Sequence, residues 1–217
     1  MIKLLVADDH PIVRDGLKQI LAETDDLGVL GEATNGLEVL QKVRAEDWDV
    51  LLLDLSMPGK SGIELIKQLK KEKPKLRILV LTVHEEHQYA VRAFKAGAMG
   101  YLTKSSPSAQ LIAAIRKVAG GGVYVSPVLA EKMALALMPS TEALPHTLLS
   151  DREYEIFQML VAGKTTTEIA QRFSISVKTV STHKSRIMEK MQMTNQAELI
   201  RYALHHHLVN ELPNLGT

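Results

Sequence analysis

The sequence predicts an α/β fold with a doubly wound, five-stranded parallel sheet, followed by a small all-α domain. From residue 1 to about residue 120, short apolar runs alternate with amphipathic stretches, which is typical of β-α-β units around a sheet buried on both faces. From residue 149 to about residue 212, the apolar residues have helical spacing throughout. The length of 217 residues suits two domains of this size.

Each predicted strand is a short aliphatic run followed by a segment with helical spacing. In the first of these helices, Pro11 suits an early turn, where its missing N–H group is not needed, and Leu17 and Leu21 share one face. Three consecutive glycines from Gly120 end the fifth helix, because glycine has a low helix propensity and readily adopts a left-handed cap. The predicted strands cover residues 3–7, 28–33, 50–53, 77–82 and 100–102.

After the glycines, the chain is expected to form a linker and then a helical domain. Residues 128–138 have the composition of a short apolar helix, and the segment 139–147 has two prolines and small polar residues, which favour an irregular conformation. Ser150 and Glu153 have the spacing of a capping box, so a helix should begin there, and Gly163 should close it. The expected parts are a first domain over 1–120, a linker with a short helix over 121–147 and a second domain over 148–217.

Composition excludes several classes of protein. The 26 lysines and arginines balance 25 aspartates and glutamates, so a nucleic-acid surface would have to be a local basic patch. The absence of cysteine excludes a disulfide scaffold, a thiolate metal site and a cysteine nucleophile, and it favours a reducing compartment such as the cytoplasm. The apolar runs fall far short of the ~18 residues of a membrane helix, and a signal-peptide pattern is missing.

Polar residues stand where four of the predicted strands end. Asp8 and Asp9 follow the first strand, and Asp54 ends the third. Thr82 ends the fourth strand, and Lys104 lies just past the fifth. Taken singly, each has a simpler explanation as a helix cap, a turn residue or a solvated charge. Because sites form at the carboxyl ends of parallel strands, the set together predicts an acidic pocket for Mg²⁺, with a hydroxyl and an amine to bind a tetrahedral anion such as a phosphoryl group.

Four segments, ADDHPIVRDGL, LLLDLSMPGKSGIEL, ILVLTVHEE and GAMGYLTKSS, resemble the receiver domain of two-component response regulators. The resemblance implies a flavodoxin-like fold and makes Asp54 the phosphoacceptor, which attacks the phosphohistidine of a sensor histidine kinase. It also implies that Asp9 and Asp54 bind Mg²⁺ directly and that Asp8 acts through water, with the backbone carbonyl of Ser56 as a further ligand. Ser56 and His84 resemble the variable pair that sets the lifetime of the phosphoryl group.

The same resemblance assigns the other side of the pocket. Thr82 would hydrogen-bond the phosphoryl group, Lys104 would pair with it, and Tyr101 would be the switch residue that changes its packing on activation. The chain departs from many receivers at Ser105, where they have proline after the lysine, which leaves a cis peptide bond at this position open.

The second domain contains the pattern of a helix-turn-helix. Apolar residues at helical spacing lie on both sides of a turn near 174–176. The second of the two helices has four cations against one acid, Glu189, although charge alone more often indicates a solvated face. Ser181, Thr182 and Ser185 lie among these cations, so groups able to meet base edges are flanked by groups able to meet phosphates. The cations are Lys178, Lys184, Arg186 and Lys190.

The segments LSDRE, AGKTTTEIA and KTVSTHKSRI resemble the LuxR-type DNA-binding domain. A receiver followed by this domain is the arrangement of the NarL/FixJ-type response regulators. The resemblance implies that lysines and the turn before the first helix of the motif contact phosphates, whereas small polar residues of the second helix face bases. The implied DNA-contacting residues are Thr165, Thr166, Thr167, Lys178, Thr179, Ser181, Thr182, Lys184, Ser185 and Arg186.

The function implied is that of a DNA-binding transcription regulator, in which phosphorylation promotes homodimerisation on promoter half-sites of double-stranded DNA. Such a chain hydrolyses its own aspartyl phosphate slowly and is not a turnover enzyme. A metal-dependent phosphatase with an aspartyl nucleophile is disfavoured, because that chemistry needs a second acid where this chain has Ser56. A DNA-binding protein with a vestigial receiver is disfavoured by the complete set of strand-end residues.

Three consecutive histidines, His205, His206 and His207, invite a metal-site interpretation. Consecutive helical positions fan out over ~200° and do not converge on one ion. We therefore expect a polar last turn of a helix at this position.

Overall fold

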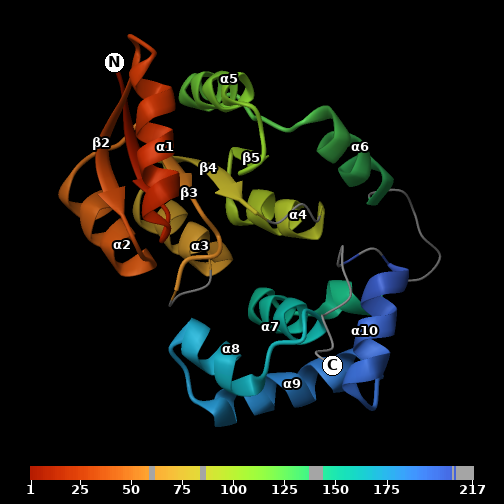
Figure 1. Cartoon of the computed structure of the whole chain (residues 1–217). Coiled ribbons are helices and arrows are strands. Elements are labelled where there is room, and N and C mark those ends of the chain that lie inside the picture. Colours follow the sequence, from red (N-terminus) through yellow and green to blue (C-terminus); the bar gives the residue numbers. More distant parts are fainter. Residues whose placement is uncertain (59–61, 84–86, 137–143, 207, 209–217) are drawn as a thin grey trace. The chain divides into compact units, whose positions relative to one another are not determined.

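The computed structural model describes residues 1–58, 62–83, 87–136, 144–206 and 208. The chain forms two compact units, Met1–Met138 and Pro139–Thr217. Figure 1 shows the sheet and its helices in the first unit and the helices of the second. No helix within the described ranges is long and apolar enough to cross a membrane.

All neighbouring strands of the first unit are parallel, in the order β2-β1-β3-β4-β5, which confirms the predicted doubly wound sheet. The chain passes outward from β1 to β2 and returns to β3 on the other side of β1. The strand order therefore reverses between β1 and β3, and sites of such sheets form beside the carboxyl ends at this point. The strands are β1 (Ile2–Ala7), β2 (Leu27–Ala33), β3 (Val50–Leu53), β4 (Arg77–Thr82) and β5 (Gly100–Thr103).

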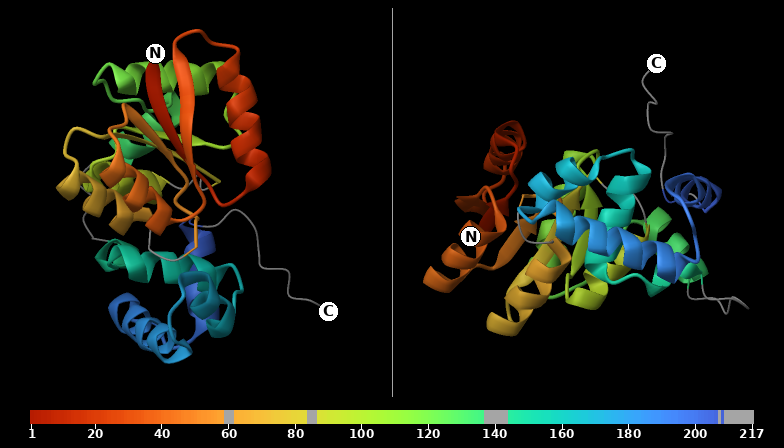
Figure 2. Two further views of the ribbon diagram at one scale, coloured as in Figure 1. Left: turned by 90° about the vertical axis from the view of Figure 1, so that its left-hand side faces the viewer. Right: turned by 90° about the horizontal axis from the view of Figure 1, so that it is seen from below.

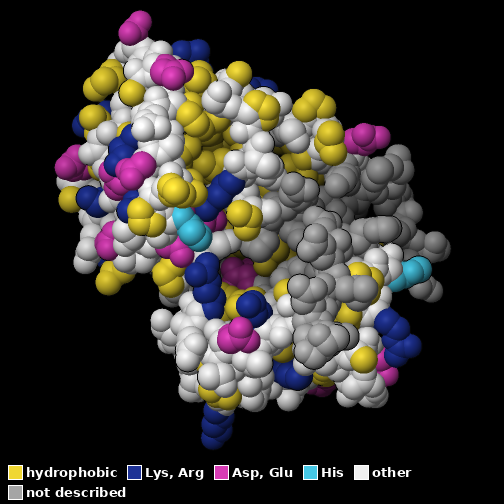
Figure 3. Space-filling model, viewed as in Figure 1, with side chains coloured by type: hydrophobic (Ala, Val, Ile, Leu, Met, Phe, Trp, Pro, Cys, Tyr) yellow, Lys and Arg dark blue, Asp and Glu magenta, His cyan; other side chains and the backbone are white. Residues whose placement is uncertain are grey.

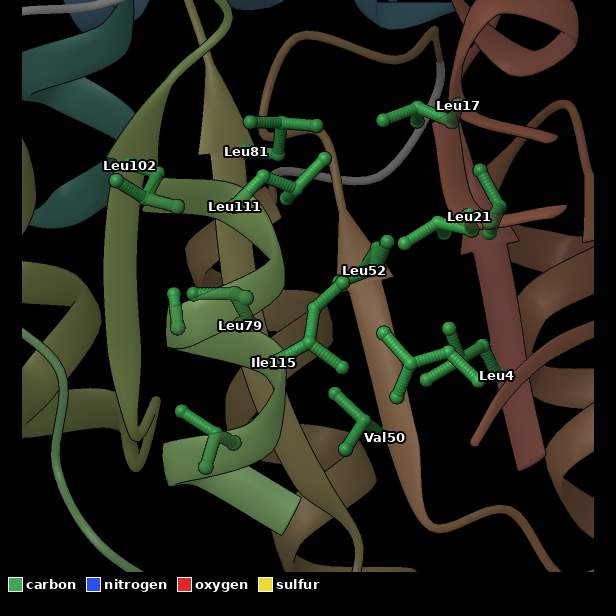
Figure 4. Close-up of a cluster of buried hydrophobic side chains, with 14 residues drawn as sticks. Leu4, Leu17, Leu21, Val50, Leu52, Leu79, Leu81, Leu102, Leu111 and Ile115 are labelled. Carbon is green, nitrogen blue, oxygen red and sulfur yellow. The ribbon is translucent and has the colours of Figure 1, made fainter. Parts of the chain in front are cut away.

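Helices cover both faces of the sheet (Figure 2). Aliphatic side chains of α1 and α5 meet alternate residues of the strands on one face (Figure 4). On the other side, α3 contacts both α2 and α4. The bounds are α1 (Pro11–Ala22), α2 (Gly36–Ala45), α3 (Gly62–Glu72), α4 (His87–Ala96) and α5 (Ser108–Ala119), and α5 ends at the predicted glycines.

The central strands are buried on both faces. Leu4 and Leu5 of β1, and Leu52 and Leu53 of β3, are consecutive residues with almost no exposed surface. Successive strand residues point to opposite faces, so both can be buried only if helices cover both sides. This packing holds β1 and β3 in one register, and it thereby places the residues that follow them side by side.

The segment after α5 extends the first unit beyond residue 120. Tyr124 forms a parallel bridge with Gly100 of the edge strand β5, and its N–H group donates to the carbonyl oxygen of Met99 at 2.9 Å. The helix α6 (Pro127–Ala136) then packs against α4. The short helix expected within 128–138 is present, and it packs on the sheet unit.

The second unit confirms the predicted helix-turn-helix. Ser174 adopts the left-handed conformation at the end of α8, with φ of 53°, and Ser176 caps α9 by accepting the N–H of Thr179 at 3.0 Å. The helix α9 contacts both α7 and α8. The elements of this unit are the 3₁₀ helix η1 (Pro145–Leu148) and the helices α7 (Asp151–Val161), α8 (Thr166–Phe173), α9 (Val177–Met191) and α10 (Gln196–His205).

The predicted start and end of α7 are both found. Ser150 and Glu153 form a reciprocal capping box, and Gly163 follows the helix with φ of 83°. Thr165 and Glu168 form a second capping box at the start of α8. Each box satisfies N–H groups that a helix leaves without an internal partner, so both helices begin at defined residues.

His146 differs from the expectation of an irregular linker. Residues 139–143 of that segment lie outside the described residues, but His146 lies in η1 and is 1% exposed. Its Nδ1 is 2.8 Å from the hydroxyl oxygen of Tyr202 on α10. The partner is 56 residues away in the sequence, so a local pattern of prolines and small polar residues could not reveal it.

Candidate functional site

The strand-end residues meet at one edge of the sheet. Ala7 of β1 pairs with Leu53 of β3, and the N–H group of Asp54 donates to the carbonyl oxygen of Ala7 at 2.9 Å. Asp8 follows Ala7, so the two acids lie on adjacent strands. On the other side of β3, the N–H group of Lys104 donates to the carbonyl oxygen of Thr82 at 2.8 Å, which places Lys104 at the same edge.

Lys104 bridges two buried carboxylates. Its Nζ lies 2.6 Å from Oδ2 of Asp8 and 2.8 Å from Oδ2 of Asp54. The side chains of Asp8 and Asp54 are 2% and 0% exposed, and that of Lys104 is 14% exposed. Buried charges need partners because they lose their hydration. The amine therefore offsets part of the repulsion between the two acids.

Burial and hydrogen bonding act in opposite directions on Asp54. Burial raises the pKa of its carboxyl group above the ordinary value, and the hydrogen bonds from Lys104 and from the N–H group of Ser56 at 2.9 Å reduce this rise without cancelling it. Burial alone would lower the pKa of Lys104, but its bonds to Asp54 and Asp8 hold that pKa above the ordinary value. The lysine therefore stays charged at neutral pH.

The acidic edge has donors suited to a divalent cation. One possible ligand atom each from Asp8, Asp9, His10 and Asp54 lies within 4.8 Å of the others. Three carboxylates face one lysine, so negative charge is in excess, and carboxylate oxygens are the ligands that Mg²⁺ prefers. The residues present therefore fit a small hard cation.

His10 was not among the residues predicted from the sequence. Its Nδ1 lies 3.1 Å from Oδ1 of Asp8 and 3.0 Å from Oδ1 of Asp9. The imidazole is 59% exposed. Figure 3 shows basic and acidic side chains interspersed over the face of the molecule that it draws. The sequence feature that could have indicated His10 is its position next to two acids at a strand end. The same position is equally explained as the start of a helix.

Two further predicted residues of this edge, Thr82 and Tyr101, are buried. Thr82 is fully buried at the end of β4, and Tyr101 of β5 is 2% exposed. Ser56 is half-buried and contacts Asp54 through its N–H group. His84 lies outside the described residues. Within the described ranges every peptide bond is trans, including the one between Lys104 and Ser105.

The predicted DNA-contacting face of α9 is exposed. Its small hydroxyl groups are turned back to the helix: those of Ser181, Thr182 and Ser185 donate to carbonyl oxygens four positions earlier, at 3.0 to 3.1 Å. This bonding uses the O–H group of each side chain and holds the hydroxyl in one position, while the oxygen can still accept hydrogen bonds. The exposed residues of the predicted set on α9 are Lys178, Thr179, Ser181, Thr182, Ser185 and Arg186.

Two of the cations of α9 have partners within the unit. Nζ of Lys184 is 3.0 Å from Oε1 of Gln196 on α10. Nζ of Lys190 is 2.6 Å from Oε2 of Glu153 on α7, so Lys190 joins two helices.

The predicted turn before α8 is accessible. Thr165 and Thr167 are exposed and Thr166 is half-buried. The hydroxyl of Thr165 caps α8, because it accepts the N–H of Glu168 at 3.2 Å.

At the end of α10, His206 lies with its ring centroid 4.3 Å from that of Tyr202 and 6.2 Å from that of His146. His205 is exposed in the last turn, and His207 lies outside the described residues. Within the described part of the chain, the acidic edge is the only group of three or more histidines and acids that could hold a metal ion.

Two family models match the chain: the response regulator receiver domain over residues 4–116 and the bacterial regulatory proteins of the luxR family over residues 147–203. Response regulator GacA of Pseudomonas syringae pv. syringae is 39% identical over 211 residues, which cover 97% of this chain and 99% of GacA. Oxygen regulatory protein NreC of Staphylococcus carnosus is 37% identical over 209 residues, which cover 93% of this chain and 96% of NreC.

Solved structures resemble the chain over most of its length. RcsB of Salmonella enterica serovar Typhimurium, bound to promoter rprA in the presence of phosphomimetic BeF₃⁻, is 29% identical with a TM-score of 0.68, and the match covers 93% of this chain and 98% of that one. Response regulator ChrA of a heme-sensing two-component system is 33% identical with a TM-score of 0.53, over 96% of this chain and 98% of ChrA.

A flavodoxin-like sheet with an acid–lysine edge, followed by a helix-turn-helix unit, defines a response regulator with a DNA-binding domain. The chain belongs to the NarL/FixJ-type response regulators of two-component systems, with a receiver domain and a LuxR-type DNA-binding domain. It is a regulator of transcription and not a turnover enzyme.

Proposed function

We propose that Asp54 is the phosphoacceptor and that its phosphorylation by a sensor histidine kinase controls homodimerisation and promoter binding. The observation that supports this most directly is the pair of contacts from Lys104 to Asp54 and Asp8. An amine already held at the buried carboxylate can pair with the oxygens of an incoming phosphoryl group without further ordering. The structural roles that we assign are a receiver over 1–120, a linker over 121–147 and a DNA-binding domain over 148–217.

The reaction would be a nucleophilic displacement at phosphorus. A carboxylate oxygen of Asp54 attacks the phosphohistidine, the new O–P bond forms as the P–N bond breaks, and the imidazole of the kinase keeps the electron pair and takes up a proton. Bound Mg²⁺ supplies positive charge against the repulsion between phosphoryl and carboxylate oxygens. Asp9, Asp54 and the carbonyl of Ser56 would hold the ion, with Asp8 acting through water.

The other residues of the edge would respond to the phosphoryl group. Lys104 pairs with one of its oxygens, and the hydroxyl of Thr82 donates to another. Tyr101 then changes its packing and alters the surface of the receiver domain. Slow attack of water on the acyl phosphate would return the protein to its starting state.

The DNA-binding domain would place α9 in the major groove, as the recognition helix of a helix-turn-helix does. Lys178, Lys184 and the turn at 165–167 would contact phosphates, and Lys184 would exchange Gln196 for a phosphate oxygen. Ser181, Thr182 and Ser185 would face bases. A dimer gains from binding two half-sites, because the second contact is intramolecular. We place the protein in the cytoplasm, where DNA is accessible to it.

Labelling with a small phosphodonor and Mg²⁺ tests the phosphoacceptor. Intact-mass measurement should show one added phosphoryl group on the wild type and none on Asp54→Asn. Asp47→Asn is the matched control, since Asp47 is 92% exposed and pairs with Lys73 on the surface, and it should be labelled normally. Undiminished labelling of Asp54→Asn would overturn the assignment.

Sedimentation and DNA binding test whether phosphorylation controls dimerisation and promoter binding. The phosphorylated wild type should sediment more heavily and bind paired half-sites more tightly than the unmodified form. Tyr101→Ala should accept the phosphoryl group but lose this difference. Equal mass and equal DNA affinity for both forms of the wild type would instead favour a vestigial receiver domain.

A base-contact role is tested by Thr182→Ala. This variant should change the order of preference among operator sequences while leaving the salt dependence of binding as in the wild type, because bases carry sequence information and phosphates carry the salt effect. A uniform loss of affinity for all sequences would place Thr182 on the phosphate backbone instead.

A further inference from the structure

Capping of helix α1 does not account for the orientation of the His10 side chain. His10 stands at the N-cap of α1 but makes no side-chain cap hydrogen bond. The residues that favour this position are serine, threonine, aspartate and asparagine, whose side-chain oxygen accepts a helix N–H. The imidazole instead lies against the carboxylates of Asp8 and Asp9. Its position is therefore determined by the acidic edge.

The distances from His10 match those between ligands of one ion. With metal–ligand bonds of about 2.1 Å in an octahedron, adjacent ligand atoms are ~3.0 Å apart and opposite ones ~4.2 Å apart. Nδ1 of His10 is 3.0 Å from Oδ1 of Asp9, which is the separation of adjacent ligands. It also lies within hydrogen-bond distance of Oδ1 of Asp8, at 3.1 Å. Together with Asp54, these possible ligand atoms lie within 4.8 Å of one another. Small side-chain movements would bring Asp9, His10 and Asp54 around one ion, with Asp8 acting through water.

A backbone hydrogen bond of His10 holds the turn in which this residue lies, and it does not depend on the imidazole ring. The N–H group of His10 donates to the side-chain oxygen Oδ1 of Asp8 at 2.9 Å, so the turn after β1 is held by a hydrogen bond that any residue except proline at position 10 retains. Pro11 follows at the start of α1. A substitution at position 10 thus removes the ring nitrogen without removing this hydrogen bond.

We propose that Nδ1 of His10 is a direct ligand of the divalent cation and makes the site prefer transition-metal cations over Mg²⁺. Imidazole nitrogen binds borderline cations such as Co²⁺ more strongly than it binds the hard Mg²⁺, whose preferred ligands are oxygens. An imidazole nitrogen also adds a ligand without adding negative charge to the three carboxylates. The inference rests on the proposed cation binding at Asp9 and Asp54, and it adds a ligand and a selectivity to that site.

Calorimetric titration of the full chain with Co²⁺ and with Mg²⁺ measures the selectivity. His10→Phe should weaken Co²⁺ binding about tenfold and Mg²⁺ binding about twofold or less, because water can replace nitrogen for Mg²⁺ at little cost. His10→Asn offers an oxygen in place of nitrogen and should show the same loss of selectivity. His205→Phe is the control for removal of an exposed histidine, and it should behave as the wild type.

Electron spin-echo spectroscopy of the Mn²⁺-loaded chain detects the ligand itself. The wild type should show modulation from a directly bound ¹⁴N nucleus, and His10→Phe should lose it, since carboxylates carry no nitrogen. An unchanged ratio of Co²⁺ to Mg²⁺ affinity in both His10 variants, or a wild-type spectrum without ¹⁴N, would overturn the role of His10 while leaving the Mg²⁺ site intact. Failure of the wild type to bind either titrated cation would overturn the proposed cation site as well.

Discussion

Lys190 of α9 holds its Nζ 2.6 Å from Oε2 of Glu153 in α7. The side chain of Glu153 is 5% exposed, and the same oxygen accepts the N–H of Ser150 at 2.8 Å in the capping box. Lys190 therefore ties α9 to the N-terminus of α7. Lys178, near the other end of the helix, is exposed. Two lysines of one helix thus have different surroundings: Lys190 holds two helices together, and Lys178 is the one that we propose contacts DNA.

Substitution of these two lysines should give opposite results. Lys190→Met should lower the free energy of unfolding by about 1–3 kcal/mol, because it leaves a buried carboxylate without its cation, whereas Lys178→Met should change it by less than about 0.5 kcal/mol. On DNA, Lys178→Met should reduce the slope of log affinity against log salt by about 0.9, and Lys190→Met should leave it unchanged. Urea denaturation and salt titration measure the two effects, and a flattened slope for Lys190→Met would be inconsistent with its structural role.

Asp54→Asn should stabilise the protein in the absence of divalent cations. Burial raises the pKa of Asp54 above its value of about 3.8 in the unfolded chain, so the protonated carboxyl group favours the folded state. This stabilisation is fully present below the unfolded pKa and is lost as pH rises through the folded pKa. At pH 7 the ionised carboxylate therefore destabilises the fold, and the variant should be more stable by roughly 1 kcal/mol. The difference should vanish below about pH 3.8. Thermal unfolding across this pH range measures it, and a less stable variant at pH 7 would contradict the expectation.

Lys104→Met should have the opposite effect at neutral pH. It leaves Asp8 and Asp54 buried without their shared amine, so the free energy of unfolding should fall by about 3–5 kcal/mol, and Mg²⁺ should restore part of the loss. The pKa of Lys104 is raised above 10.5, so its contribution is fully present below that pH and disappears as pH rises through the folded value. The free energy of unfolding of the wild type should therefore fall at alkaline pH, and that of Lys104→Met should not show this fall. Lys73→Met, which breaks a surface pair with Asp47 at 2.8 Å, is the control and should cost less than about 1 kcal/mol.

Tyr202→Phe tests the contact that holds the start of the second unit. The variant removes the hydroxyl 2.8 Å from Nδ1 of the buried His146 and keeps the aromatic ring. The free energy of unfolding should fall by about 1–3 kcal/mol, because a buried imidazole nitrogen loses its partner. Chemical denaturation of the full chain measures this, with Tyr124→Phe as a control in the first unit. Equal stability of Tyr202→Phe and wild type would show that the hydrogen bond is replaced by another.

The strand-end acids were predictable because two regular features of a chain place them. Aliphatic runs of strand length with helices between them favour a parallel sheet with both faces buried, and residues such as Asp8 and Asp54 then follow the ends of strands. The start of α7, where Ser150 and Glu153 form a capping box, was predictable for a similar reason, since a capping box is completed within four residues. The helix-turn-helix follows from local spacing as well.

Contacts between distant parts of the chain had no such local signal. His146 lies in a segment with the composition of a linker, and only packing against α10 makes it a buried residue. Tyr124 extends the sheet unit beyond the glycines because the edge strand β5 offers free backbone groups. In the sequence, Lys190 is one more cation of a basic helix, and only the structure shows that it pairs with Glu153.

The sequence by itself determined the order of the strands and helices, the residues at the carboxyl edge and the basic face of α9, because each depends on periodicity, spacing or a cap within a few positions. Only the tertiary structure decided which charges pair. Lys104 meets Asp54 across 50 residues and Lys190 meets Glu153 across 37, and His10 turns toward acids instead of capping its helix. The physical reason is that burial makes an unpaired charge costly, and which partner is available depends on how the whole chain packs.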